Sequence, residues 1–337
     1  MLWTHRIPSL SVAQSQTSAQ ANSARTSTGQ VSPLPDKTVL VIRQCSRQYP
    51  ADQPNGHSAK IPVYNPPMHT LPPKIPVILA IGGHDPGGGA GIQADIEAVA
   101  ANGCHCTSAI TCITFQDSCN VQALAPLPAQ QVLAQVEAVL ADCRVRAIKI
   151  GLIGSVEITE ALAGLLESHP QIPLVLDPVL AAGGGTPLAG QLLLETIRQR
   201  LLPLTTLITP NSPEARRLAD GPQTLEQCAT QLLQQGSQGV LITGTHEADE
   251  QVINTLYLAD GRRQRSNWQR LPGEYHGSGC TLAAAVAAGL AQGKSLEDAV
   301  NAALTFTWQS LAQGFRSGRC QSLPNRLYRL ERGFKHD

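Results

Sequence analysis

The sequence has no excess of charge of either sign: its 337 residues include 25 Lys and Arg and 25 Asp and Glu, a formal net charge of +0. Proteins that bind nucleic acid normally carry a basic stripe, so this balance argues against a nucleic-acid partner. No apolar run reaches the roughly 18 residues that a membrane-spanning helix needs. We therefore expect a protein that neither binds nucleic acid nor crosses a membrane.

Cysteine patterns typical of staples and metal centres are also missing. The nine Cys are an odd number, include no C-x-x-C pair and have no His-rich cluster nearby, which argues against a disulfide framework and a zinc site. We interpret eight of them as small apolar residues in a reducing compartment, and we expect a cytoplasmic protein. Cys280 is the exception, because of the residues around it.

The composition of the chain changes near residue 74. Residues 1–73 are rich in Ser, Thr, Gln and Pro. Such a segment cannot bury enough apolar surface to fold, so we interpret it as a low-complexity, disordered extension. Its first 35 residues contain Arg but no acid, and a transit peptide is the alternative. A single α/β domain is expected over 74–330, followed by a short tail at 331–337.

Short apolar runs alternate with stretches of helical periodicity through this domain. The runs are typical of buried parallel strands and occur at 75–81, 147–150, 174–176, 206–208 and 240–242. The helical stretches occupy 90–102, 129–141, 156–168, 188–201 and 225–235. This alternation predicts βαβ units on a mostly parallel sheet, with helices on both faces. An edge hairpin is expected from 252–258 and 264–268, and two closing helices from 278–292 and 296–313.

Chemistry-bearing residues follow several of these strands, at the edge of a parallel sheet where ligands bind. The first strand leads into a glycine-rich loop, 82–91, whose backbone N–H groups can approach a ligand closely. Its spacing fits neither a dinucleotide-binding nor a Walker A loop. Asp177 and Glu214 follow two later strands and are placed to hold a metal ion, although Glu214 also fits the first turn of a helix.

The last loop, Gly277-Ser278-Gly279-Cys280, runs straight into a strong helix former. Two glycines release the backbone so that successive N–H groups converge at a helix N-terminus, which suits the charge of a transferred phosphoryl group. Cys280 lies in the first turn, where the helix dipole favours a thiolate able to accept a proton. The loop therefore predicts a small-molecule kinase with Cys280 as its general base.

These loops, in this order, resemble the ribokinase superfamily, and within it the hydroxymethylpyrimidine/phosphomethylpyrimidine kinase family of thiamine biosynthesis. The resemblance covers about residues 75–330. Its motifs are Gly83-His84-Asp85-Pro86-Gly87-Gly88-Gly89-Ala90-Gly91, Lys149-Ile150-Gly151, Asp177-Pro178-Val179, Thr209-Pro210-Asn211 with Glu214, and His276-Gly277-Ser278-Gly279-Cys280-Thr281. Many sugar kinases of the superfamily have Asp where this chain has Cys280, and Cys is a feature of the pyrimidine kinase branch. The resemblance implies a three-layer α/β/α ribokinase-like fold, ATP and Mg²⁺ as cofactors, and a homodimer.

The resemblance also implies a role for each residue of the site. The pyrimidine pocket would be formed by Gly83, Asp85, Ala90, Gln116, Leu152 and Val179. The side-chain amide of Gln116 offers both a donor and an acceptor to the ring. The nucleotide would be contacted by Asn211, Thr243 and His246, and Mg²⁺ would be held by Asp177 and Glu214. The phosphoryl group in transfer would be held by the amides of Gly277, Ser278, Gly279 and Cys280, while Cys280 takes the hydroxymethyl proton.

Thr243 departs from the family pattern, which has Lys here, so a cation near the nucleotide phosphates is missing. Two alternatives stay open. One is a pyridoxal-type kinase, whose substrate also carries a hydroxymethyl group on a nitrogen heteroaromatic ring. The other is a regulator that binds the pyrimidine without turnover, which the missing Lys supports. Gln116 and Cys280 favour the pyrimidine kinase.

Overall fold

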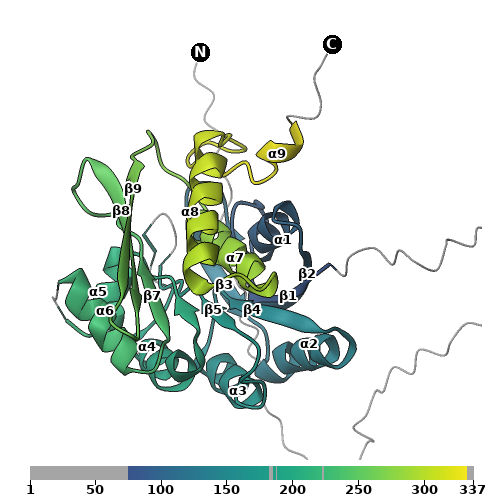
Figure 1. The fold of residues 1–337 in the computed structure, drawn as a ribbon. Coiled ribbons are helices and arrows are strands. Elements are labelled where there is room, and N and C mark those ends of the chain that lie inside the picture. Colours follow the sequence, from purple (N-terminus) through teal and green to yellow (C-terminus); the bar gives the residue numbers. More distant parts are fainter. Residues whose placement is uncertain (1–74, 182–184, 187, 222–223, 332–337) are drawn as a thin grey trace, which may run out of the picture. The chain divides into compact units, whose positions relative to one another are not determined.

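The computed structural model describes residues 75–181, 185–186, 188–221 and 224–331. The predicted extension, 1–73, and the predicted tail beyond residue 331 lie outside the described residues. The strands are β1 (Val77–His84), β2 (His105–Gln116), β3 (Val121–Pro126), β4 (Val145–Ile150), β5 (Leu174–Leu176), β6 (Leu207–Ile208), β7 (Gly239–Ile242), β8 (Gln251–Leu258) and β9 (Arg263–Gln269). They form one sheet in the order β3-β2-β1-β4-β5-β6-β7-β8-β9 (Figure 1).

Parallel pairing joins six neighbouring strands of the sheet, in the order β2, β1, β4, β5, β6 and β7. At the two edges, β3 and the β8–β9 hairpin pair in the antiparallel sense. The helices are α1 (Gly91–Ala101), α2 (Ala129–Asp142), α3 (Val156–Leu166), α4 (Gln191–Thr196), α5 (Ser212–Leu218), α6 (Leu225–Gln234), α7 (Ser278–Ala291), α8 (Leu296–Ala312) and α9 (Tyr328–Glu331). None of these described helices is long and apolar enough to cross a membrane.

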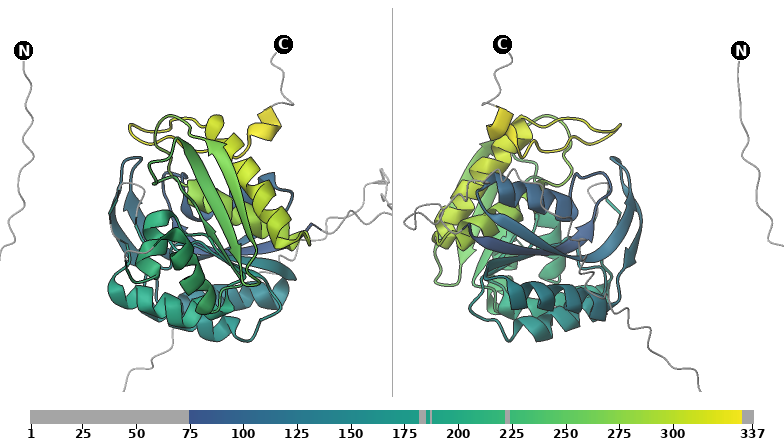
Figure 2. Two further views of the ribbon diagram at one scale, coloured as in Figure 1. Left: turned by 60° about the vertical axis from the view of Figure 1, so that its left-hand side comes forward. Right: turned by 90° about the vertical axis from the view of Figure 1, so that its right-hand side faces the viewer.

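Helices cover both faces of the sheet because successive side chains of a central strand point to opposite faces. On β1, Ile78 packs in one core cluster with residues of α1, α7 and α8. Its neighbours Leu79 and Ile81 pack in a second cluster with residues of α2, α3, α4, α5 and α6. Figure 2 shows the sheet between these two helical layers. The predicted three-layer α/β/α architecture, with an edge hairpin over β8 and β9, is confirmed.

The sequence patterns missed β2 and β3. The polar residues of β2 explain why it was missed, because Thr107, Ser108, Thr111 and Thr114 alternate with its apolar residues, so no continuous apolar run marks the strand. The helix expected over 188–201 is also shorter than predicted. It begins at Gln191 and passes at Ile197 into a π-helical turn, η1 (Ile197–Leu201).

Side-chain caps start several helices, and α7 is different. Ser155 Oγ accepts from the Ile158 N–H at the start of α3, and Asn211 and Glu214 form a reciprocal capping box at the start of α5. A cap of this kind satisfies N–H groups that a helix leaves unpaired. Helix α7 instead follows an N-cap glycine, Gly277, which has a φ of 82° and supplies no side-chain cap. Its first amides therefore remain available to a ligand.

Candidate active site

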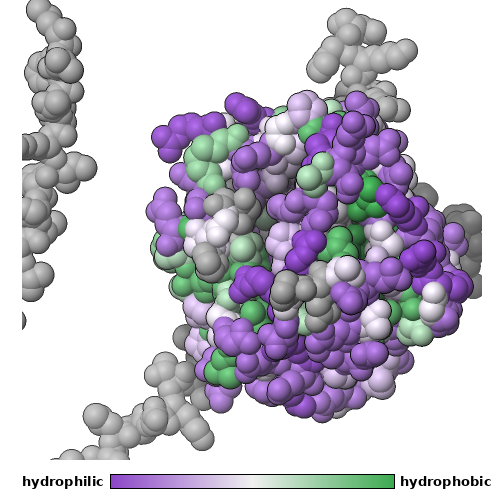
Figure 3. Space-filling model, turned by 90° about the vertical axis from the view of Figure 1, so that its left-hand side faces the viewer, coloured by the Kyte–Doolittle hydropathy of each residue, from purple (hydrophilic) through white to green (hydrophobic). Residues whose placement is uncertain are grey.

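Loops at the carboxyl ends of the parallel strands line one cavity of about 780 Å³. All the predicted site residues line it: Gly83, Asp85, Ala90, Gln116, Leu152, Asp177, Val179, Asn211, Glu214, Thr243, His246, Gly277, Ser278, Gly279 and Cys280. Figure 3 shows one face of the molecule, where hydrophobic side chains lie in a recess with hydrophilic ones around it. Ligands of open α/β sheets bind at this edge.

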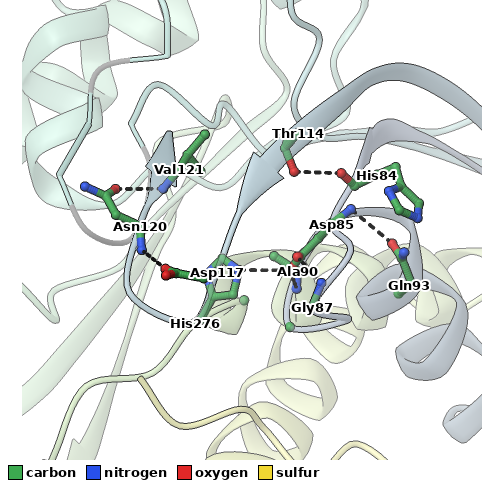
Figure 4. Close-up of polar contacts among 12 residues, drawn as sticks. His84, Asp85, Gly87, Ala90, Gln93, Thr114, Asp117, Asn120, Val121 and His276 are labelled. Carbon is green, nitrogen blue, oxygen red and sulfur yellow. Dashed lines mark hydrogen bonds and ion pairs between the residues drawn. The ribbon is translucent and has the colours of Figure 1, made fainter. Parts of the chain in front are cut away.

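Asp85 organises the glycine-rich loop after β1. Its Oδ1 accepts from the Gly87 N–H and its Oδ2 from the Ala90 N–H, both at 2.8 Å. His276 Nε2 lies 3.0 Å from the same Oδ2, so Asp85 joins this loop to the one before α7 (Figure 4). Burial acts to raise the pKa of Asp85, but these hydrogen bonds outweigh it and the pKa is lowered. The carboxylate thus shapes the pocket through contacts within the protein.

The two glycine loops touch each other directly. A Cβ added at Gly277 would lie 1.9 Å from the Gly89 carbonyl oxygen, and one added at Gly279 would lie 3.5 Å from Asp177 Oδ1. The positive φ of Gly277 is a second reason why only glycine fits there. The first turn of α7 therefore lies against the glycine-rich loop on one side and against Asp177 on the other.

Buried charges lie beneath this turn. Lys149 Nζ is 2.8 Å from Asp95 Oδ1 and 3.8 Å from Asp177 Oδ2. Burial acts to lower the pKa of Lys149, but the charges of Asp95, Cys280 and Asp177 outweigh it and raise the pKa. Burial also raises the pKa of Asp177. The Lys149 side chain therefore remains protonated beside the first turn of α7.

Burial raises the pKa of Cys280 to about 12, with Lys149 acting in the opposite direction. In the free protein this shift opposes the thiolate that we expect the start of the helix to favour. Removal from water costs the thiolate more than the helix N-terminus and Lys149 return. Neutralising the nearby carboxylates would reduce this cost.

Glu214 has the helix-capping contacts expected for it, and its side chain is buried. Its Oε2 accepts from the Asn211 N–H at 2.9 Å and its Oε1 from the Leu180 N–H at 3.3 Å. Burial, followed by the charge of Asp177, raises its pKa to about 8. Asp177 Oδ2 is buried with no hydrogen-bond partner among the described residues. Two buried acids, one of which raises the pKa of the other, suit a divalent cation, which would neutralise both. A group of three or more metal-binding side chains is absent from the part of the chain that the structure describes.

Two arginines that the sequence did not single out line the cavity. Arg217 donates to the carbonyl oxygens of Leu180 and Ala189. Arg270, just beyond β9, donates to the carbonyl oxygens of Thr245, Glu247 and Asp249. These guanidinium groups bring positive charge to the cavity that Thr243 cannot supply. Single arginines carry no spacing signal in a sequence, so only the fold reveals them.

The far end of the cavity is aromatic. The rings of Trp268 and Trp308 stack with their centroids 6.0 Å apart. Trp268 Nε1 and Thr307 Oγ1 are buried there without a hydrogen-bond partner among the described residues, and both residues line the cavity. An apolar wall with free polar groups suits a flat nitrogen heterocycle. These residues were also missed, because aromatic residues at this spacing look like ordinary core.

Residues 314–327, the C-terminal segment, contact the loops of the site through Arg326. The buried Arg326 donates from Nε to Thr281 Oγ1 and from Nη1 to Glu97 Oε2, at 2.8 and 3.0 Å. Its Nη2 donates to the Gly89 carbonyl oxygen. One guanidinium thus ties together α1, the glycine-rich loop and α7. Nothing in the sequence around Arg326 predicted this role.

A disulfide joins Cys119 and Cys320, whose Cα atoms are 5.0 Å apart. The prediction that the cysteines form no disulfide is therefore wrong for this pair. The error has a simple cause: the two residues are 201 positions apart, and only the fold brings them together. The other cysteines that the structure describes are not part of a disulfide: 104, 106, 112, 143, 228 and 280.

A parallel sheet of this order, with a glycine-rich loop facing an open helix N-terminus and two buried acids, defines a small-molecule kinase with a ribokinase-like fold. The family model described as phosphomethylpyrimidine kinase matches residues 85–325. The chain belongs to that family.

Relatives and solved structures agree with this assignment. The hydroxymethylpyrimidine/phosphomethylpyrimidine kinase of Haemophilus influenzae is 38% identical over 250 residues, which are 72% of this chain and 93% of the relative. A crystal structure of the Clostridium difficile phosphomethylpyrimidine kinase superposes with a TM-score of 0.62 at 32% identity, covering 71% of this chain and all (100%) of that one. An ADP complex of Bacillus subtilis pyridoxal kinase has a TM-score of 0.69 at 29% identity, covering 76% of this chain and 99% of that one.

Proposed function

We propose that this protein transfers a phosphoryl group from ATP to 4-amino-5-hydroxymethyl-2-methylpyrimidine, to its monophosphate, or to both. One observation carries the proposal: Cys280 lies in the open first turn of α7, in the cavity that Asp177 and Gln116 also line. The amides supply the anion site, the thiol an acceptor for a proton, and Gln116 a partner for an aminopyrimidine ring.

The reaction needs the substrate hydroxymethyl oxygen to attack the γ-phosphorus while the bond from phosphorus to ADP breaks. The amides of 278–280 stabilise charge on the equatorial oxygens. Cys280 receives the hydroxyl proton. Lys149 favours the thiolate that this requires, and loss of negative charge at Asp177 favours it further, since Asp177 acts to raise the pKa of Cys280. Binding of the cosubstrates thus prepares the base.

Asp177 and Glu214 are the residues that would hold Mg²⁺. The ion typically keeps several waters and takes one or two carboxylates plus phosphate oxygens, which fits a pair of acids better than a closed cage. It would supply neutralisation of charge on the β- and γ-phosphates. Two observations support this assignment: Asp177 Oδ2 has no hydrogen-bond partner among the described residues, and the pKa of Glu214 is raised.

In this proposal, the pyrimidine binds at one end of the cavity and the nucleotide at the other. Gly83, Ala90, Gln116, Leu152 and Val179 surround the pyrimidine, and Asp85 shapes that end. The nucleotide lies toward Asn211, Thr243 and His246, with Arg217 and Arg270 nearby and the Trp268–Trp308 wall beyond. Arg270 and Arg217 bring positive charge to this end of the cavity, but neither replaces the Lys that the family has at the position of Thr243.

We also propose that residues 74–330 form the kinase domain, with 1–73 an extension and 331–337 a tail. A homodimer in the cytoplasm is the expected working form. Small-angle scattering and fractionation of cells that express the full chain would test these two points.

Release of ADP by the full-length protein with ATP and Mg²⁺ tests the function. Pyrimidine alcohol, pyrimidine monophosphate and pyridoxal are compared as acceptors. We expect kcat/KM to be higher with a pyrimidine. Preference for pyridoxal would support the second candidate, which the Bacillus subtilis likeness favours. Tight pyrimidine binding with no ADP release from any acceptor would identify a regulator and overturn the proposal.

A further inference from the structure

The disulfide between Cys119 and Cys320 lies at the rim of the cavity. Cys119 is in the turn between β2 and β3, and Cys320 is in the C-terminal segment. Cys320 is exposed and Cys119 half-buried, so a reductant in solution can reach them. The residues beside the bond on each side, Gln116, Val121 and Gln321, line the cavity.

On the hairpin side, the turn is organised by short-range hydrogen bonds. Asp117 Oδ1 accepts from the N–H groups of Cys119 and Asn120, at 2.8 and 3.1 Å (Figure 4). Asn120 Oδ1 accepts from Thr186 Oγ1 at 3.0 Å, which connects the turn to the loop after β5. The position of Cys119 is therefore coupled to the wall that carries Gln116.

On the C-terminal side, the chain lies against the loop that precedes α7. The Ser322 carbonyl oxygen accepts from the His276 N–H, and the Ser322 N–H donates to the Glu274 carbonyl oxygen, both at 2.9 Å. His276 in turn contacts Asp85. Ser322, two residues beyond Cys320, is thus hydrogen-bonded to the loop that leads into α7.

Without the covalent bond, the junction between these two sides is weak. The Gln321 N–H donates to the Ser118 carbonyl oxygen at 3.1 Å, and the Cys320 N–H donates to Ser118 Oγ at 3.3 Å. Arg319 and Asp117 form an ion pair at 3.6 Å, with 85% and 43% of their side chains exposed. Exposed pairs of this kind contribute little to stability. The disulfide is consequently the main restraint.

A general stabilisation of the fold is a poor explanation of the Cys119–Cys320 disulfide. Disulfides compensate for a small core, whereas this domain has two extensive buried clusters. The other cysteines that the structure describes form no disulfide. A disulfide in a kinase of the reducing cytoplasm is typically a reversible one.

We propose that Cys119 and Cys320 form a thiol–disulfide exchange site that controls affinity for the pyrimidine, with a dithiol protein or small dithiol as the reaction partner. A thiolate of the dithiol attacks the exposed Cys320 Sγ, and Cys119 leaves as a thiolate and takes a proton. The second thiol of the partner then displaces Cys320 from the mixed disulfide. The chain gains two electrons and two protons, and the partner becomes a disulfide. Oxidation holds the Gln116 wall against the C-terminal segment, and reduction releases it.

The proposal rests on the pyrimidine kinase function, and its test compares the full-length chain before and after treatment with dithiothreitol. Non-reducing peptide mapping should find the Cys119–Cys320 link only before treatment. We expect reduction to raise KM for the pyrimidine by about fivefold, roughly 1 kcal/mol of binding, with KM for ATP unchanged. Cys119→Ser and Cys320→Ser should have the high KM under both conditions. The control Cys143→Ser should respond like the wild type.

Equal pyrimidine KM values in the two redox states would overturn the proposal, and so would failure of oxidised dithiothreitol to restore the link. If no pyrimidine is phosphorylated in either state, the proposed function fails by itself. Measuring the exchange of backbone amide hydrogens then tests the proposed redox role of the disulfide separately. Faster exchange of 117–121 and 320–322 after reduction supports the coupling, and unchanged exchange overturns it.

Discussion

Arg326 donates a hydrogen bond of 2.8 Å to Thr281 Oγ1 in the first turn of α7, although the two residues are 45 positions apart in the chain. The same guanidinium group reaches Gly89 in the opposing loop. The two halves of the anion site are therefore held by a side chain that itself lies outside the cavity.

Arg326→Gln should reduce kcat by at least tenfold, since small displacements of a catalytic loop are costly in rate. Stability should fall by about 1–3 kcal/mol because Glu97 and the Gly89 carbonyl lose their donor. Steady-state kinetics and urea unfolding measure the two effects, with Arg329→Gln on the same segment as control. A variant with normal kcat per folded molecule would show that Arg326 acts on stability alone.

Cys280→Ala should lower kcat about a hundredfold, the usual contribution of a general base. Pyrimidine affinity, measured by calorimetry, should stay within about twofold because the thiol acts in proton transfer. Cys228→Ala, in α6 on the other layer, is the matched control. Near-normal turnover of Cys280→Ala would place the base elsewhere, at a water held by Asp177.

Thr243→Lys should lower KM for ATP several-fold, because a charged hydrogen bond to a phosphate contributes about 1.5–3 kcal/mol in favourable geometry. Thr243→Met adds length without charge and should not change it. An unchanged ATP affinity in the Lys variant would indicate that Arg270 or Arg217 already meets the phosphates.

Lys149→Met should destabilise the protein by about 3–5 kcal/mol, since it leaves Asp95 and Asp177 as buried acids without a counter-ion. The double variant Lys149→Met with Asp95→Leu should regain part of this loss. Chemical unfolding measures both, and the exposed Lys294→Met is the control. No recovery in the double variant would mean that the pair is not energetically coupled.

Glu247 links stability to pH. The hydrogen bond from Arg216 lowers its pKa to about 2 from an ordinary 4.5. A lowered folded-state pKa stabilises the protein above pH 4.5, and this contribution is lost as the pH falls toward 2. Glu247→Gln should therefore be less stable than the wild type at pH 6, with a gap that narrows by pH 3. The exposed Glu250→Gln should show no such gap, and a constant gap for Glu247→Gln would contradict the linkage.

The parallel strands and most helices could be predicted because their side chains are buried on both faces or on one regular stripe, as in β5 (Leu174–Leu176). Periodicity of this kind is visible locally. β2 escaped prediction, since polar residues such as Thr111 and Thr114 interrupt its apolar pattern. The site residues on glycine loops were also predictable, because Gly277 and Gly279 mark an open helix start in the sequence itself.

The sequence by itself determined the order of the loops, the place of Cys280 at the start of a helix after a glycine loop, and the family. Only the tertiary structure decided that burial raises the pKa of that thiol, that Arg326 holds the loop, and that Cys119 meets Cys320. The physical reason is the same in each case. Desolvation and long-range contacts depend on which distant segments pack together, and no local spacing of residues records that.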